Sequence, residues 1–186
     1  MRLWTFRDPN EWRAAEKAGR LRADGRRVME RGFRPAYRWM MSQMRKRIVG
    51  YGGRFPLWAW AEKGPADLRR AGHGTKGSEM LLVTCEVPAE RVLLSDFAAW
   101  HFALNGWHLG LTEAEDASWE RRWQHRKPDQ LPPAARRRME RSWERMFDFK
   151  ALAASKEING DRATQAVLEE LMVPDEVVSV RAFVAR

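Results

Sequence analysis

The chain contains five short runs in which apolar residues dominate or alternate with polar ones, a pattern typical of β-strands. They cover residues 2–6, 55–61, 80–87, 91–94 and 177–184. The run at 80–87 is apolar almost throughout, which predicts a central strand covered on both faces. A sixth segment, 165–173, fits a helix by its composition and a strand by its position before Pro174, so both interpretations stay open.

Segments with helical periodicity lie between and after these strands. Asp8 and Pro9 predict the start of a helix that ends at Gly19, because Asp accepts the first free amides and Gly adopts the left-handed conformation at a helix end. Its inward-facing positions are expected to be Trp12, Ala15 and Ala18. The other predicted helices cover 35–48, 97–104, 113–123 and 134–149. Residues 150–163 are expected to be irregular.

This succession of strands and helices, without an internal repeat, predicts one α+β domain over residues 1–186. Its sheet is expected to be mixed or mostly antiparallel and flanked by helices. A chain of 186 residues, 44% of them hydrophobic, is large enough to bury a core. No apolar run approaches the roughly 18 residues of a membrane helix, and no apolar signal stretch follows Met1.

Cys85 is the single cysteine, so the chain forms no internal disulfide and no cysteine-based zinc site. This usage fits a cytoplasmic location. Because Cys85 lies in the most apolar run, it is expected to be buried and unreactive. The four histidines, at positions 73, 101, 108 and 125, show no spacing typical of metal ligands. We therefore predict no metal site.

The net charge of +9, from 34 Lys and Arg against 25 Asp and Glu, favours a polyanionic partner such as nucleic acid or a dinucleotide. A GC-rich genome, in which Arg codons are plentiful, explains the same excess as charge on the solvated surface. Ten tryptophans are the second unusual feature, and core packing is the better interpretation for most of them. They occupy positions 4, 12, 39, 58, 60, 100, 107, 119, 123 and 143.

Basic stretches interleaved with Trp make a nucleic-acid-binding module without catalysis the alternative function. These stretches lie at 20–34, 45–54, 69–76 and 121–145. The arginines best placed along one helix for phosphate contact are Arg136, Arg137, Arg138, Arg141 and Arg145. Such a binder predicts an open basic face with exposed Trp. The sequence neither favours nor excludes a regulatory partner protein, and it indicates no oligomeric state.

Several blocks of the sequence resemble a bacterial family catalogued only as a domain of unknown function. They are Arg2-Leu3-Trp4-Thr5, Phe55-Pro56-Leu57-Trp58-Ala59-Trp60, Val92-Leu93-Leu94-Ser95-Asp96-Phe97 with Trp100-His101, Ser142-Trp143-Glu144-Arg145-Met146-Phe147-Asp148, and Gln165-Ala166 with Glu170-Leu171. The blocks span nearly the whole chain. This resemblance implies a family but no chemistry.

The order of elements is also similar to that of small, divergent ADP-ribosyltransferases. Such proteins begin with a strand that carries an NAD-contacting residue and continue with a capped helix that contains a Trp. Here Thr5, seven residues before Trp12, stands where they often have His. They end on a Gln-x-Glu-like segment and a last strand, which Gln165, Glu169 and Glu170 resemble. The resemblance implies an ADP-ribosyltransferase-like fold with NAD as the substrate.

The same resemblance implies roles for particular residues. A carboxylate near the ribose 2′-OH orients the sugar and stabilises positive charge as nicotinamide leaves. Glu170 is the candidate for that carboxylate and Glu169 its rival, although both also read as solvated charges on a helix or an edge strand. The candidate NAD-binding residues are Arg2 for a phosphate, Thr5 for the ribose or the amide, Trp4, Trp58 or Trp60 for ring stacking, and Asp96 as a second polar group. A transferase therefore predicts one cleft that gathers these groups.

Overall fold

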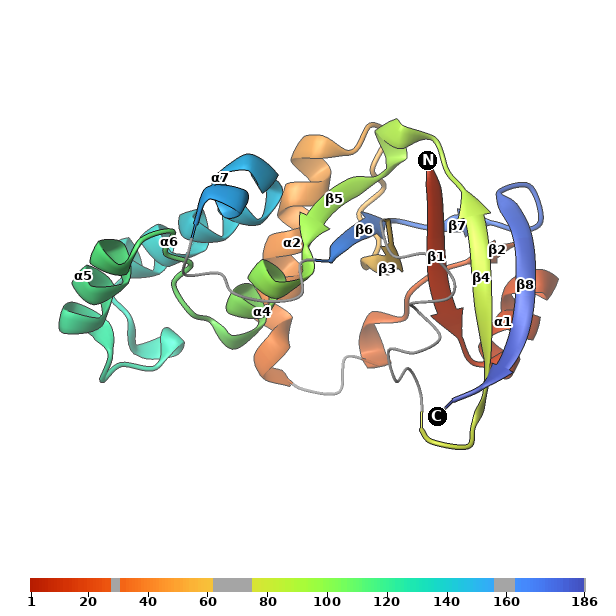
Figure 1. Cartoon of the computed structure of the whole chain (residues 1–186), viewed down its shortest axis with the longest axis horizontal. Helices are drawn as coiled ribbons and strands as arrows, with labels where there is room; N and C mark the ends of the chain where they lie inside the picture. Colours follow the sequence, from red (N-terminus) through yellow and green to blue (C-terminus); the bar gives the residue numbers. More distant parts are fainter. Residues whose placement is uncertain (28–30, 62–74, 156–162, 186) are drawn as a thin grey trace. The chain divides into compact units, whose positions relative to one another are not determined.

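The computed structural model describes residues 1–27, 31–61, 75–155 and 163–185, and its chain forms two compact units (Figure 1). The first unit contains Met1–Arg27, Met40–Leu94 and Ala163–Arg186. The second unit contains Val28–Trp39 and Ser95–Arg162. Segments from both ends of the sequence thus build the first unit.

A six-stranded antiparallel sheet is the main element of the fold and confirms the predicted α+β class. Its order is β5-β6-β3-β1-β4-β8. The strands are β1 (Arg2–Arg7), β3 (Leu57–Trp60), β4 (Glu79–Glu86), β5 (Leu93–Asp96), β6 (Thr164–Leu168) and β8 (Val177–Val184). The most apolar run, β4, lies between β1 and β8, as predicted for a central strand.

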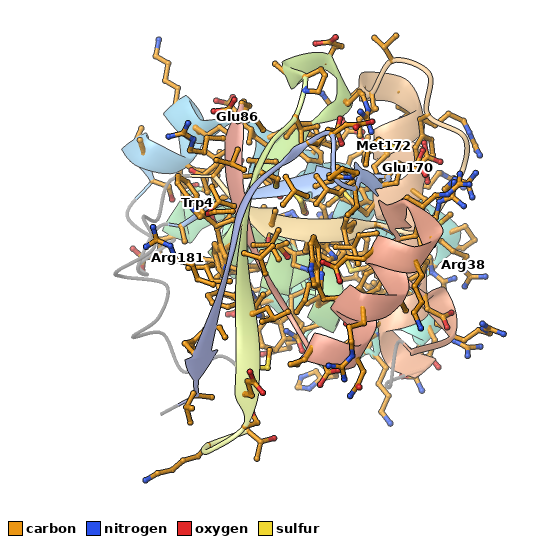
Figure 2. The ribbon with its side chains drawn as sticks, turned by 90° about the vertical axis from the view of Figure 1, so that its right-hand side faces the viewer. Trp4, Arg38, Glu86, Glu170, Met172 and Arg181 are labelled. Carbon is orange, nitrogen blue, oxygen red and sulfur yellow. The ribbon has the colours of Figure 1, made fainter. Side chains whose placement is uncertain are left out.

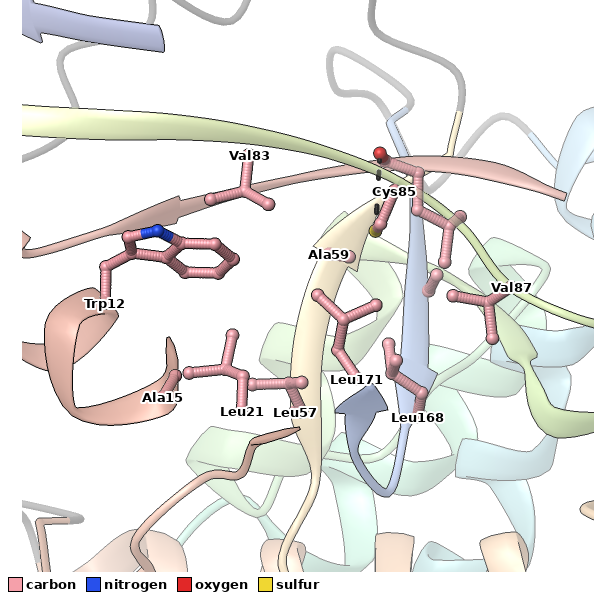
Figure 3. Packing of buried hydrophobic residues seen from close by; sticks show 12 residues of the cluster. Trp12, Ala15, Leu21, Leu57, Ala59, Val83, Cys85, Val87, Leu168 and Leu171 are labelled. Carbon is pink, nitrogen blue, oxygen red and sulfur yellow. Dashed lines mark hydrogen bonds between the residues drawn. The ribbon is translucent and has the colours of Figure 1, made fainter. Parts of the chain in front are cut away.

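The register of the sheet determines which side chains share the buried face of the first unit. Leu3 lies opposite Cys85, and Thr5 lies opposite Val83. Alternation along each strand places Leu3 and Val83 on the face that packs against helix α1 (Pro9–Ala18). Figure 3 shows this packing, with Trp12 of α1 over the sheet. Cys85 lies inside the cluster, where its thiol donates to the carbonyl of Leu3.

Helix α1 begins and ends where its capping residues predict. The Asp8 carboxylate accepts from the amides of Asn10 and Glu11, and Gly19 ends the helix at a φ of 68°. Trp12 and Ala15 are buried, as expected. The prediction for Ala18 was wrong, because its side chain is exposed at the end of the helix.

The ambiguous segment 165–173 forms strands and not a helix. Strand β6 pairs with β3 along its whole length, and β7 (Leu171–Met172) pairs with β2 (Arg20–Leu21) in a separate two-stranded sheet. All five β6 side chains are buried. Continuous burial on both faces belongs to an inner strand, and this explains why no alternation was visible in the sequence.

Helices dominate the second unit. They are α4 (Phe97–Asn105), α5 (Glu113–Trp123), α6 (Pro133–Ser142) and α7 (Phe149–Ala154), and helix α2 (Arg34–Arg47) contributes residues to both units. None of the described helices is long and apolar enough to span a membrane.

The predicted helix over 134–149 is shorter in the structure. The α-helix ends at Ser142, whose hydroxyl donates to the carbonyl of Met139, and a 3₁₀ segment, Trp143–Phe147, follows. Asp148 then accepts from the amide of Ala151 and caps α7. Part of the expected irregular stretch 150–163 is therefore helical, and residues 156–162 lie outside the described part of the chain.

Candidate functional site

Glu169 and Glu170, the two candidate carboxylates, follow β6 directly, outside any helix or strand. Glu169 accepts from the backbone amides of Gly52, at 2.9 Å, and of Arg54, at 3.1 Å. A Cβ on Gly52 would lie 2.9 Å from a Glu169 oxygen, so a larger residue there would displace this carboxylate. Glu169 therefore holds the 52–54 loop, and its carboxylate is already occupied.

Glu170 forms an ion pair instead. Its Oε2 lies 2.6 Å from a guanidinium nitrogen of Arg22, and both side chains are half-buried. Arg91 donates to the backbone carbonyl of Glu170 and pairs through a second nitrogen with Glu176. The interpretation of Glu170 as a solvated charge is wrong, because Arg22 and Arg91 fix both its side chain and its backbone.

Arg22 connects Glu170 to an open cavity of about 500 Å³ beside α1. Three arginines line this cavity together with apolar side chains of α1, β2 and β3. They are Arg7, Arg20 and Arg22. Two acidic residues, Glu11 and Asp24, also line it, and Asp24 forms an ion pair with Arg26.

Arg7 is the most buried of the three cations. One of its terminal nitrogens donates to the carbonyl of Phe6, whereas Nε and the other terminal nitrogen are buried without a hydrogen-bond partner in the described structure. Burial lowers the pKa of Arg7 below its usual value, and the charge of Glu11 opposes that shift. Buried guanidinium donors that lack partners have a strong preference for an anionic acceptor.

Thr5 lies on the same face of the sheet as Arg7, two residues away on β1. Its hydroxyl donates to the carbonyl of Trp58 at 2.9 Å and is nearly inaccessible. The oxygen keeps a lone pair, but its proton already serves the contact between β1 and β3.

The indole candidates lie on the opposite face. Trp4 is in register with Trp60, and Trp60 is in register with Gln165, so these three side chains form a row across β1, β3 and β6. Trp58, two residues before Trp60, alternates onto their face, but it is also among the residues that line the arginine cavity. Figure 2 shows Trp4 and Glu170 on opposite sides of β4. The structure therefore does not gather Trp4 or Trp60 with Glu170 in one cleft of the first unit.

Arg2 and Asp96 each have a local partner. Arg2 forms an exposed ion pair with Glu86 at 2.6 Å. Asp96 is buried in the second unit, where its carboxylate accepts from the amide of Ala99 and caps α4, as its position in the sequence predicts. The first contact stabilises the start of β1, and the second stabilises the start of α4.

Arg7 and Arg22 are cavity residues that the sequence reasoning missed. Arg7 follows Thr5 at a spacing of two, one residue beyond the predicted strand 2–6, and an extension of this alternation was a usable signal. Arg22 lies in a basic stretch without periodicity, so only the folded structure reveals its contact with Glu170.

The second unit contains a separate aromatic cavity of about 620 Å³, bordered by α5 and the segment after it. His108 lines it and stacks on Trp119, with ring centroids 4.5 Å apart and planes at 12°. Nδ1 of His108 is buried without a protein hydrogen-bond partner among the described residues, since the nearest Asp116 oxygen is 3.7 Å away. Within the described part of the chain, no group of three or more His, Cys, Asp or Glu side chains converges to hold a metal ion.

His108 is expected to make the protein less stable as the pH falls from 7.5 to 5.5. Burial and the charge of Arg145 lower its pKa below the usual 6.5, although Asp116 opposes the shift and Arg138 adds to it. The unfolded chain therefore binds a proton at a higher pH than the folded chain, so stability is lost through this window. Denaturant unfolding at both pH values should show a smaller loss in His108→Gln. An unchanged loss in the variant would assign the pH dependence to other groups.

Comparison with known families gives one match. The model of a domain of unknown function, DUF3841, matches residues 2–175. No curated protein and no solved structure matches the chain.

Proposed function

Because the chain belongs to the DUF3841 family, whose description assigns no chemistry, we propose from its own residues that it is an ADP-ribosyltransferase-like enzyme acting on NAD. The observation that carries the proposal is the ion pair between Glu170 and Arg22, because Arg22 lines a cavity together with Arg7 and Arg20, while Glu170 itself lines a smaller cavity of about 260 Å³. A carboxylate next to a cationic cavity suits a ligand that carries both a sugar and a pyrophosphate.

The donors of the cavity fit the anionic part of NAD. Nε and one terminal nitrogen of Arg7 have no acceptor among the described residues, and Arg20 and Arg22 add two further guanidinium groups. Guanidinium groups bind phosphate oxygens through paired, charge-assisted hydrogen bonds. In this proposal Arg7 and Arg20 bind the pyrophosphate, while Arg22 positions Glu170.

Glu170 supplies the chemistry in this proposal. Its carboxylate accepts from the ribose 2′-OH and stabilises the positive charge that develops on the sugar as the bond to nicotinamide breaks. Thr5 lies on the same face, but its hydroxyl is nearly inaccessible and donates to Trp58, so we assign it no contact with the ligand. Trp4 and Trp60 lie on the other face of the sheet, so we assign them no stacking contact with a ligand bound here. We keep the cytoplasmic location that the single cysteine favours.

The decisive experiment measures nicotinamide released from NAD by the purified protein and by Glu170→Gln. We expect the release rate to fall about 100- to 1,000-fold in the variant, the range for loss of one electrostatic group at a reacting centre. NAD affinity, measured by calorimetry, should change only a few-fold, because Arg7 and Arg20 remain. Glu90→Gln, a neutralisation of an exposed glutamate of the same unit, is the matched control and should keep the wild-type rate.

Circular dichroism and thermal melting of both variants verify that the loss is not one of folding, since Glu170→Gln also weakens the contact with Arg22. The proposal fails if the wild-type protein releases no nicotinamide. It also fails if a folded Glu170→Gln variant keeps the wild-type rate.

A further inference from the structure

The aromatic cavity of the second unit contains indole faces that the ring contacts within the cavity leave uncovered. The ring of Trp119 stacks on His108, and its centroid lies 6.2 Å from that of Trp123. The guanidinium of Arg126 lies over Trp123 at 6.0 Å. Trp107, which also lines the cavity, is 58% exposed. Indole faces stack on nucleic-acid bases with little regard to base identity.

Positive charge is concentrated in the segment that follows α5, although the cavity lining itself holds two cations, Arg126 and Lys127, and two acidic residues, Asp116 and Glu120. Residues 121–141 contain eight Arg and Lys against two acidic residues, a net charge of +6. The eight side chains are exposed, and none forms an ion pair in the described residues. They are Arg121, Arg122, Arg126, Lys127, Arg136, Arg137, Arg138 and Arg141.

The charge extends beyond the cavity itself. Gly106, Pro128 and Met139 line both the aromatic cavity and a second cavity of about 680 Å³. The charged residues that line the second cavity are Arg38, Asp129, Arg136 and Glu140. The two cavities thus adjoin within the second unit. A mononucleotide would occupy only one of them, whereas a chain of phosphates can follow the cations of both.

We propose that the second unit binds single-stranded nucleic acid, with a base stacked in the cavity of Trp119 and Trp123 and the phosphates on the arginines of residues 121–141. A single strand fits better than a duplex, because bases in a duplex are already stacked and paired. A base edge also supplies hydrogen-bonding groups beside His108, whose Nδ1 has no partner in the part of the chain that the structure describes. This site is independent of the proposed NAD chemistry, which involves residues of the first unit.

Fluorescence anisotropy with a labelled 12-nucleotide single strand tests the stacking contact. Trp123→Ala should weaken binding about fivefold to a hundredfold, the loss expected for one stacked base, at an unchanged salt dependence. Trp123 is half-exposed at the end of α5, so the variant is expected to fold, which circular dichroism verifies.

The phosphate contacts have a different signature. The double variant Arg137→Glu/Arg138→Glu should lower the slope of log affinity against log salt by about 1.4, the value for two lost contacts to a single strand. Arg13→Glu/Lys17→Glu, two exposed cations of helix α1, changes the net charge equally and should keep the slope. If this control lowers the slope equally, net charge alone attracts the nucleic acid, and the proposed site is wrong.

Competitors distinguish the possible ligands. Unlabelled single strand should displace the probe, and a duplex of the same length should do so at least tenfold less well. Displacement by AMP at the same concentration as the oligonucleotide would overturn the proposal in favour of a mononucleotide pocket. Absence of binding at 50 mM salt would overturn it outright.

Discussion

Replacement of Leu3 by Ala is expected to lower the free energy of unfolding by about 2–5 kcal/mol, the range for removing a large aliphatic side chain from a core. Leu3 is 0% exposed near the start of β1, opposite Cys85, and belongs to the cluster that joins the sheet to Trp12 of α1. Its neighbours come from strands fixed by pairing on both sides, so they cannot collapse into the space left behind. The loss should fall in the upper part of the range.

Denaturant unfolding at pH 7.5 measures this change. Val178→Ala is the matched control, because Val178 lies on the edge strand β8 and is 52% exposed; its loss should stay below about 1 kcal/mol. If Leu3→Ala costs no more than the control, the β1 strand does not have the buried register described above.

Local signals were enough to predict much of the fold. Asp8 and Gly19 delimit α1 through contacts within a few residues, and the apolar alternation of β1 and β8 is likewise local. Segments whose environment is decided by distant residues were harder. The strand β6 has no alternation because β3 and β5 flank it and both its faces are buried.

The candidate site was less predictable for a related reason. Trp4 and Thr5 are adjacent in the sequence and were assigned to one ligand, but adjacent residues of a strand point to opposite faces of the sheet. The alternation that predicted β1 already implied this separation. The pairing of Glu170 with Arg22 spans 148 residues and follows from the β2–β7 ladder. The sequence did not predict this ladder, because its strands are only two residues long.

Replacement of Trp143 by Ala is the corresponding prediction for the second unit, with an expected loss of about 3–5 kcal/mol. Trp143 is 2% exposed, its ring packs edge-on against Trp39, and its indole N–H donates to the carbonyl of Trp107 at 2.7 Å. Trp143→Phe keeps a ring but leaves that carbonyl without its donor, so it should lose less, about 1–3 kcal/mol. A loss in Trp143→Ala below that of Trp143→Phe would contradict the packing around this indole.

The two variants together also test the prediction of a single domain over residues 1–186. Leu3 and Trp143 lie in different units. If the units unfold as one cooperative domain, each variant shifts one common transition, detected alike by far-ultraviolet circular dichroism and by Trp fluorescence. If the units are independent, Leu3→Ala separates two unfolding transitions. The transition of the first unit shifts, whereas that of the second unit, which Trp143→Ala shifts, keeps its wild-type midpoint. Helix α2 contributes residues to both units, and an unbroken helix transmits the loss of one core to the other. We therefore expect the common transition.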